Sequence, residues 1–127
     1  MEKKIQATAL VFGFLAIVFG AFGAHALKAH LSSDQLISFE TGVRYQMYHA
    51  LFLLFVSKIS LSEKAKNVIF YLAVSGVILF SFSIYLLTTK SVSGIDFGAI
   101  GFITPIGGLL MILAWIVLFL NIIKKKA

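Results

Sequence analysis

Glu40 and Arg44 are the residues of this sequence whose types and spacing are most suggestive of chemistry. An acid and a base four positions apart meet on one face of an α-helix. The segment that follows them, Tyr45–Ser57, carries no charge and is strongly apolar. Ionisable groups inside a bilayer cost roughly 2.5–3.5 kcal/mol, so they face a partner or a water-filled cavity. The pair is therefore either a neutralising ion pair or part of a binding or proton-transfer site.

Three further polar residues, His25, Tyr48 and His49, complete a candidate intramembrane polar cluster. His25 ends the first apolar stretch, and we expect it at the depth of Glu40, within reach of Glu40 or Arg44. His49 lies deeper and on another side of its helix, so we do not expect all five side chains to share one pocket. For each histidine, an interhelical hydrogen bond is favoured over a proton relay.

The sequence contains no motif for a cofactor, a metal or an enzymatic reaction. There is no cysteine, which excludes disulfides and thiolate metal sites. The three histidines are dispersed and lack a metal-ligand spacing. Nucleophile elbows, phosphate loops, HExxH and paired carboxylates are all absent. We predict a protein that is not an enzyme and that binds neither metal nor cofactor.

The composition places the chain in a membrane. Of its 127 residues, 60% are hydrophobic and 13% are charged, against roughly 25% charged in soluble domains. So short a chain cannot hide this much apolar surface in a water-soluble core. The net charge of +6 comes from lysines and arginines grouped between apolar runs, which is typical of membrane flanks rather than of a nucleic-acid-binding surface. We expect lipids as partners and no nucleic acid.

Charges divide the chain into four predicted helices in a single domain, residues 1–127. The expected ranges are 5–28, 33–58, 67–89 and 97–123. Each exceeds the ~20 residues that cross about 30 Å of hydrocarbon. Ser32, with Gln35 three positions later, predicts a capping box at the start of the second helix.

The second helix is the unusual one, because it carries charge. One arc of it is apolar, and the sequence predicts that this arc faces lipid: Leu36, Phe39, Val43, Ala50 and Leu54. Another arc holds Glu40, Arg44 and Tyr48, and we expect it to face the interior of the bundle.

Short connections predict an all-α, up-down-up-down transmembrane four-helix bundle. Eight lysines fall at the N-terminus, the second connection and the C-terminus, against two in the other connections. This positive-inside bias predicts that both termini are cytoplasmic, in a multi-pass protein of the cell membrane. The first apolar stretch has about 20 residues, longer than the 7–15 of a signal peptide, so we expect it to remain as a helix.

Helix four contains the one proline, Pro105. Within the predicted range 97–123 it would lack a hydrogen-bond donor and clash with the preceding turn, so we expect a kink at Thr104 and Pro105.

Four stretches resemble the signatures of a known family: Gly20–Lys28, Phe39–Leu51, Ser81–Leu87 and Ile103–Gly108. The family consists of small four-span membrane proteins and is catalogued as domain of unknown function 423. It occurs in bacteria, and a small transmembrane protein of animals is similar. The resemblance covers nearly the whole chain. It implies a location and a topology, but no established activity.

The leading functional hypothesis is a non-enzymatic bundle whose polar cluster binds a lipid headgroup, a small solute or a partner helix. One alternative is a small proton- or ion-coupled transporter. Small multidrug exporters carry a glutamate in their first helix, whereas the first helix predicted here has none. Another alternative is a membrane assembly or scaffold factor. A homo-oligomer is a further hypothesis, because four helices alone enclose little volume.

Overall fold

A computed structural model describes residues 1–89 and 101–125 of the chain. These residues form helices without strands, so the predicted all-α class is confirmed. The elements in chain order are α1 (Glu2–Ala24), α2 (Ser33–Lys58), α3 (Glu63–Val77), η1 (Ile78–Phe82, a π-helical segment), α4 (Ser83–Thr88) and α6 (Ile103–Ile123).

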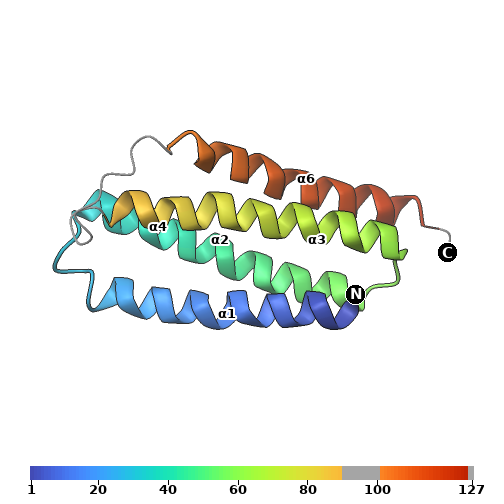
Figure 1. The fold of residues 1–127 in the computed structure, drawn as a ribbon, viewed down its shortest axis with the longest axis horizontal. Helices are drawn as coiled ribbons and strands as arrows, with labels where there is room; N and C mark the ends of the chain where they lie inside the picture. The colour runs from blue at the N-terminus through green and yellow to red at the C-terminus, as the bar shows by residue number, and fades with distance from the viewer. Residues whose placement is uncertain (90–100, 126–127) are drawn as a thin grey trace.

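The helices lie side by side along the long axis of the molecule, with α3, η1 and α4 forming one continuous rod (Figure 1). Neighbours in the chain run in opposite directions, as the short connections predict. α2 packs between α1 and the α3–α4 rod, and α6 packs on α3 and η1. The start of α1, the α2–α3 connection and the end of α6 share one end of the bundle (Figure 1).

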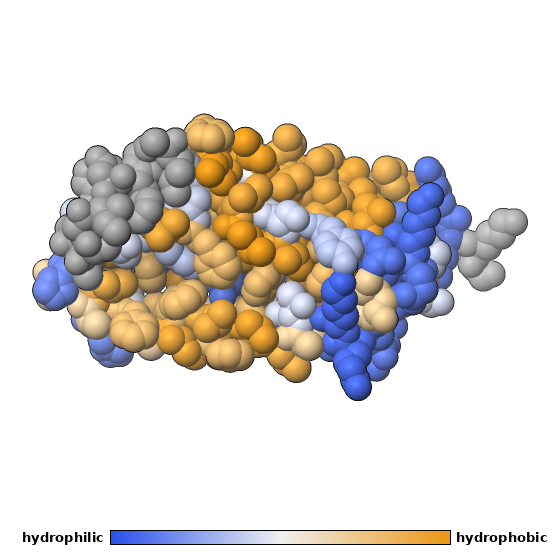
Figure 2. Space-filling view, in the orientation of Figure 1, coloured by the Kyte–Doolittle hydropathy of each residue, from blue (hydrophilic) through white to orange (hydrophobic). Residues whose placement is uncertain are grey.

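That end is rich in lysine, and we refer to it as the lysine-rich end. It carries Lys3, Lys4, Lys58, Lys64, Lys66, Lys124 and Lys125. Figure 2 shows a hydrophilic surface there, next to a broad apolar band over the middle of the molecule. An apolar band of this kind is what a bilayer requires of the surface that it contacts.

The first residues of α2 and α3 are determined by side-chain caps rather than by the positions of charged residues. At α2, the Ser32 hydroxyl accepts from the backbone of Gln35 at 3.1 Å, and the Gln35 side chain accepts from the backbone of Ser32 at 2.9 Å. The predicted capping box and the range 33–58 are confirmed. α3 begins at Glu63 rather than residue 67, because the Ser62 hydroxyl caps it by accepting from Ala65 at 3.1 Å.

The other two predicted ranges also shift. α1 ends at Ala24 rather than residue 28, and turns follow it. α6 begins at Ile103, and the predicted start at residues 97–100 lies outside the described residues. Pro105 therefore occupies the first turn of α6, where backbone N–H groups have no partner within the helix. In this position proline starts a helix instead of kinking one, so the structure does not support the expected kink.

Within the described residues, three helices are long and apolar enough to cross a membrane by length and composition: α1, the α3–α4 rod and α6. α2 is not apolar enough for that class. Its 26 residues nevertheless extend about 39 Å at 1.5 Å per residue. α2 packs along α1 on one side and the α3–α4 rod on the other. It is therefore a member of the four-helix bundle, as predicted.

A close helix approach joins α6 to the rod at Gly107. A Cβ atom at this position would overlap the backbone nitrogen of Phe80, and would lie 2.7 Å from the carbonyl carbon of Leu79. The rod is π-helical here, so a widened turn receives the glycine. This contact explains why α6 follows the rod instead of α1.

We predict that Gly107→Ala lowers thermal stability while Gly108→Ala does not. At Gly108 the nearest atom to an added Cβ is Phe80 Cδ1, at an ordinary 3.6 Å. Both changes gain the same helix propensity, about 1 kcal/mol, whereas only the first overpacks a backbone contact, at about 1–3 kcal/mol. Thermal denaturation of both variants in one detergent provides the measurement, and equal midpoints would contradict the close contact.

Candidate functional site

Gln46 lies at the centre of the polar interior. It is completely buried. Its Nε2 donates to the backbone oxygen of Phe12 in α1 at 2.8 Å, and its Oε1 accepts from the Tyr85 hydroxyl in α4 at 2.7 Å. One side chain of α2 thus joins three helices. An interhelical hydrogen bond of this kind contributes on the order of 0.6 kcal/mol in membrane proteins, and up to about 1.7.

A second bond reinforces this junction. The Ser81 hydroxyl donates to the backbone oxygen of Gly42 at 2.7 Å. The Tyr85 ring lies so close to Gly42 that a Cβ there would be 2.8 Å from it. The rings of Phe19 and Phe39 flank Tyr85, with centroids 5.1 and 5.0 Å away. Gln46 is not among the site residues predicted from the sequence, although an uncharged polar residue in mid-helix was the available signal.

His49 forms a hydrogen-bonded link between α2 and α6. Its Nδ1 lies 2.7 Å from the backbone oxygen of Tyr45, and its Nε2 lies 3.1 Å from Trp115 Nε1. A carbonyl only accepts and an indole N–H only donates, so Nδ1 carries the proton and Nε2 is the acceptor. His49 is therefore a neutral imidazole with both nitrogens engaged. The expected interhelical hydrogen bond is present for this histidine, from Trp115 to His49.

An open apolar groove runs along this link, between α2 and α6. One section has a volume of about 670 Å³ and extends from the link to Phe55 and Leu118. The other has about 510 Å³ and extends to Phe80 and Met111. Both sections share the link residues as lining. We call the two sections together the α2–α6 groove.

Glu40 and Arg44 do not lie in the interior of the bundle. Both are exposed, and Arg44 Nη2 donates to the Thr41 hydroxyl at 3.0 Å. The expected Glu40–Arg44 ion pair is not formed. Within residues 1–89 and 101–125, the structure has a single salt bridge, between Lys58 and Glu2 at 3.7 Å.

The predicted lipid and protein faces of α2 are therefore the wrong way round. The arc expected to face lipid packs on α1, where glycines make room for it. A Cβ at Gly20 would lie 3.5 Å from Val43, and one at Gly23 would lie 3.2 Å from the Phe39 ring. Because lipid and a helix surface are equally apolar, hydrophobicity alone does not tell the two faces apart. The small residues of α1 give the inward arc room to approach.

His25 and Tyr48 are also exposed. His25 caps the C-terminus of α1, with its backbone N–H donating to Ala21 at 3.1 Å. The contact of Gly23 with Phe39 gives His25 a depth near that of Glu40, as expected, but the structure shows no bond from His25 to Glu40 or Arg44 in the part of the chain that it describes. The five candidate residues are not brought together.

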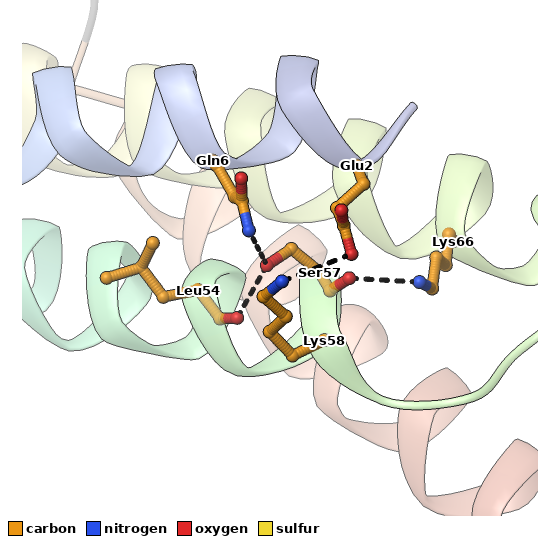
Figure 3. A network of polar contacts seen from close by, with 6 residues as sticks. All are labelled: Glu2, Gln6, Leu54, Ser57, Lys58 and Lys66. Atoms are coloured by element: carbon orange, nitrogen blue, oxygen red, sulfur yellow. Dashed lines mark hydrogen bonds and ion pairs between the residues drawn. The ribbon is translucent and has the colours of Figure 1, made fainter.

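A separate polar network closes the lysine-rich end (Figure 3). Gln6 donates to the Ser57 hydroxyl at 3.4 Å, and the buried Lys66 donates to the Ser57 backbone oxygen at 3.0 Å. A lysine at the last carbonyls of a helix neutralises its negative end. Lys66 thus ties α3 to the end of α2, a role that counting lysines for topology did not reveal.

Among the described residues, no three histidine, cysteine or acidic side chains gather where they could hold a metal ion.

Comparison with known proteins assigns the family. Residues 19–108 match the model of a family described as "Protein of unknown function (DUF423)". The chain belongs to this family. The match includes Gln46 and Tyr85 and also the exposed Glu40 and Arg44, whereas Trp115 lies beyond it.

Curated relatives are membrane proteins of similar length. The UPF0382 membrane protein of Staphylococcus aureus (strain bovine RF122) is 39% identical over 111 residues, covering 87% of each chain. The relative named YwdK in Bacillus subtilis is 36% identical over 115 residues, with 87% of this chain and 88% of that protein covered. The Haemophilus influenzae relative is 34% identical over 131 residues, covering 100% and 99%. No solved structure matches. The family is thus one of membrane proteins without an assigned role.

We predict that Tyr85→Phe and Gln46→Leu each reduce stability, and that the double variant costs less than their sum. Each single change leaves a buried polar partner unsatisfied, whereas the double change removes both partners. A double-mutant cycle of unfolding in bicelles should give a coupling of about 0.6–1.7 kcal/mol. Tyr45→Phe, at a partly exposed ring, serves as the control. Strict additivity would show that the Gln46–Tyr85 bond contributes nothing.

Proposed function

We propose that this chain is a non-enzymatic membrane protein that docks a partner helix along the outward face of α2. The observation that carries the proposal is a continuous row of exposed side chains on that helix, which we call the α2 stripe. It consists of Ile37, Glu40, Arg44, Tyr48, Leu51 and Phe55.

The spacing of the α2 stripe suits a helix partner. Its members follow one another at intervals of three or four positions, so they form a nearly straight seam on a helix. Ile37, Leu51 and Phe55 are more than half exposed. A second helix laid on this seam would bury apolar side chains at both ends and the charged pair between them.

The depth of the charged pair gives the reason for a partner. The network at Ser57 supports placing the edge of the hydrocarbon there. Counted from Ser57 at about 1.5 Å per residue, Arg44 lies roughly 20 Å and Glu40 roughly 25 Å along α2. Both are then inside a hydrocarbon core of about 30 Å, with Arg44 about 5 Å from its centre and Glu40 about 5 Å from its far edge. A charge at the centre costs roughly 2.5–3.5 kcal/mol, so Arg44 above all requires a partner. A lipid phosphate would satisfy Arg44 but repel Glu40, whereas a helix with both charges satisfies both.

The interior supports binding at the surface rather than chemistry or transport. Throughout residues 1–89 and 101–125, every buried side-chain nitrogen and oxygen has a hydrogen-bond partner within the protein. Among these residues, no buried side-chain polar atom is left over for a substrate. Glu40, the acid that a coupled transporter would use, lies on the outer face of α2 instead of in an enclosed space. The geometry therefore favours docking over the transporter hypothesis.

The asymmetry of charge supports a cytoplasmic location for the lysine-rich end in the cell membrane, with lipid covering the remaining exposed apolar side chains. We predict that a fused reporter active only in the cytoplasm is active at the C-terminus and inactive when inserted in the α1–α2 connection. A reporter active only outside should give the reverse pattern, and the same result at both positions would contradict the topology.

We predict that a photoreactive amino acid at Leu51 forms protein adducts in intact membranes, and that one at Ile17 does not. Leu51 and Ile17 are matched positions, because their side chains are 59% and 66% exposed and both lie in mid-helix. If Leu51 captures a protein, the α2 stripe is a docking surface. Adducts with lipid alone at both positions would overturn the proposal.

A further inference from the structure

We propose that the partner of the α2 stripe is a second copy of this chain, with Glu40 of each copy paired to Arg44 of the other. This inference rests on the proposed docking function. It assigns an intermolecular role to Glu40 and Arg44, which the fold leaves on the surface of α2.

The α2 stripe is self-complementary in charge. Two copies inserted in the same direction are related by a two-fold axis along the membrane normal, so each contributes the same patch. Their α2 helices are then parallel, so each seam residue lies level with its own counterpart, and Glu40 of one copy reaches Arg44 of the other diagonally across the seam. Glu40 and Arg44 are about 6 Å apart along the axis, a stagger that a long arginine side chain bridges. In parallel coiled coils, opposite charges likewise pair across the two helices, although there they flank the seam, whereas Glu40 and Arg44 lie on it.

The geometry of Arg44 leaves it available for such a pair. Its guanidinium makes one hydrogen bond, to Thr41, in the described part of the chain, whereas a guanidinium has five N–H donors. Thr41 holds the group toward the same helical turn as Glu40, where a carboxylate of another copy would receive a bidentate pair. Within residues 1–89 and 101–125, neither Glu40 nor Arg44 forms a salt bridge, so both charges can pair with another copy.

The apolar half of the α2 stripe contributes a concave surface for packing against the second copy. Tyr48, Leu51 and Phe55 also line the α2–α6 groove, so the seam borders a concave apolar surface. Side chains of the second copy would pack into this surface while the charges meet one to two turns away. Packing and an interhelical charge pair are the forces that associate helices in lipid, where the hydrophobic effect contributes little.

Charge reversal in two differently tagged copies tests the pairing. Wild-type copies should capture each other after detergent extraction. Glu40→Arg copies should not capture one another, nor should Arg44→Glu copies, because each pair places like charges across the seam. We expect these like-charged pairs to lose at least about tenfold in capture, which corresponds to 1.4 kcal/mol.

A mixture of the two charge-reversed variants should recover capture. In the mixed pair the two introduced charges, a positive one from Glu40→Arg and a negative one from Arg44→Glu, face each other across the seam. The native Arg44 of the first variant then faces the native Glu40 of the second. A mixed pair that captures no better than the like-charged pairs would overturn the inference.

A second measurement keeps the native charges. The chain has no cysteine, so Leu51→Cys introduces a unique thiol on the α2 stripe and Ile17→Cys an equally exposed one on α1. Oxidation in intact membranes should give a disulfide-linked dimer with the first variant and none with the second. Equal cross-linking at both positions, or at neither, would contradict a second copy on the α2 stripe.

The outcomes also separate the two proposals. A photo-adduct at Leu51 with a different protein, without capture between wild-type copies, would refute the second copy and leave the docking function standing. The absence of any protein adduct at Leu51 would refute both.

Discussion

The rotation of α2 about its own axis is the constraint on which the rest of the structure depends. Gln46 fixes it, because its amide bonds to α1 on one side and α4 on the other. In lipid, where apolar side chains gain little by turning inward, a buried amide with two partners outweighs the pattern of hydrophobicity. Once Gln46 points inward, His49 is turned toward α6 and Glu40 is turned away from the bundle.

Glycines make that rotation sterically feasible. Gly20 and Gly23 let Val43 and Phe39 approach α1, and Gly42 receives the Tyr85 ring. The same device joins α6 to the rod through Gly107. Hydrogen bonds therefore determine which face of α2 turns inward, and small residues allow the helices to pack closely.

Much of the fold could be predicted from the sequence, because a bilayer restricts the choice to long apolar helices and because charged residues, mostly lysines, mark where those helices end. The capping box at Ser32 could also be predicted, because Gln35 follows it at the required spacing. The rotation of α2 could not be predicted, because an apolar arc packs equally well on lipid and on a protein neighbour. We had expected the charged arc to face inward. The bond from Trp115 to His49 joins residues far apart in the chain, and nothing local in the sequence signals it.

The bond between His49 and Trp115 has a practical consequence. Trp115 is the sole tryptophan of the chain, and it lines both sections of the α2–α6 groove. The tryptophan fluorescence of the chain therefore comes from one indole ring, whose N–H donates to His49 of α2. The molecule carries its own optical probe, without any label, at the place where its second and last helices are held together.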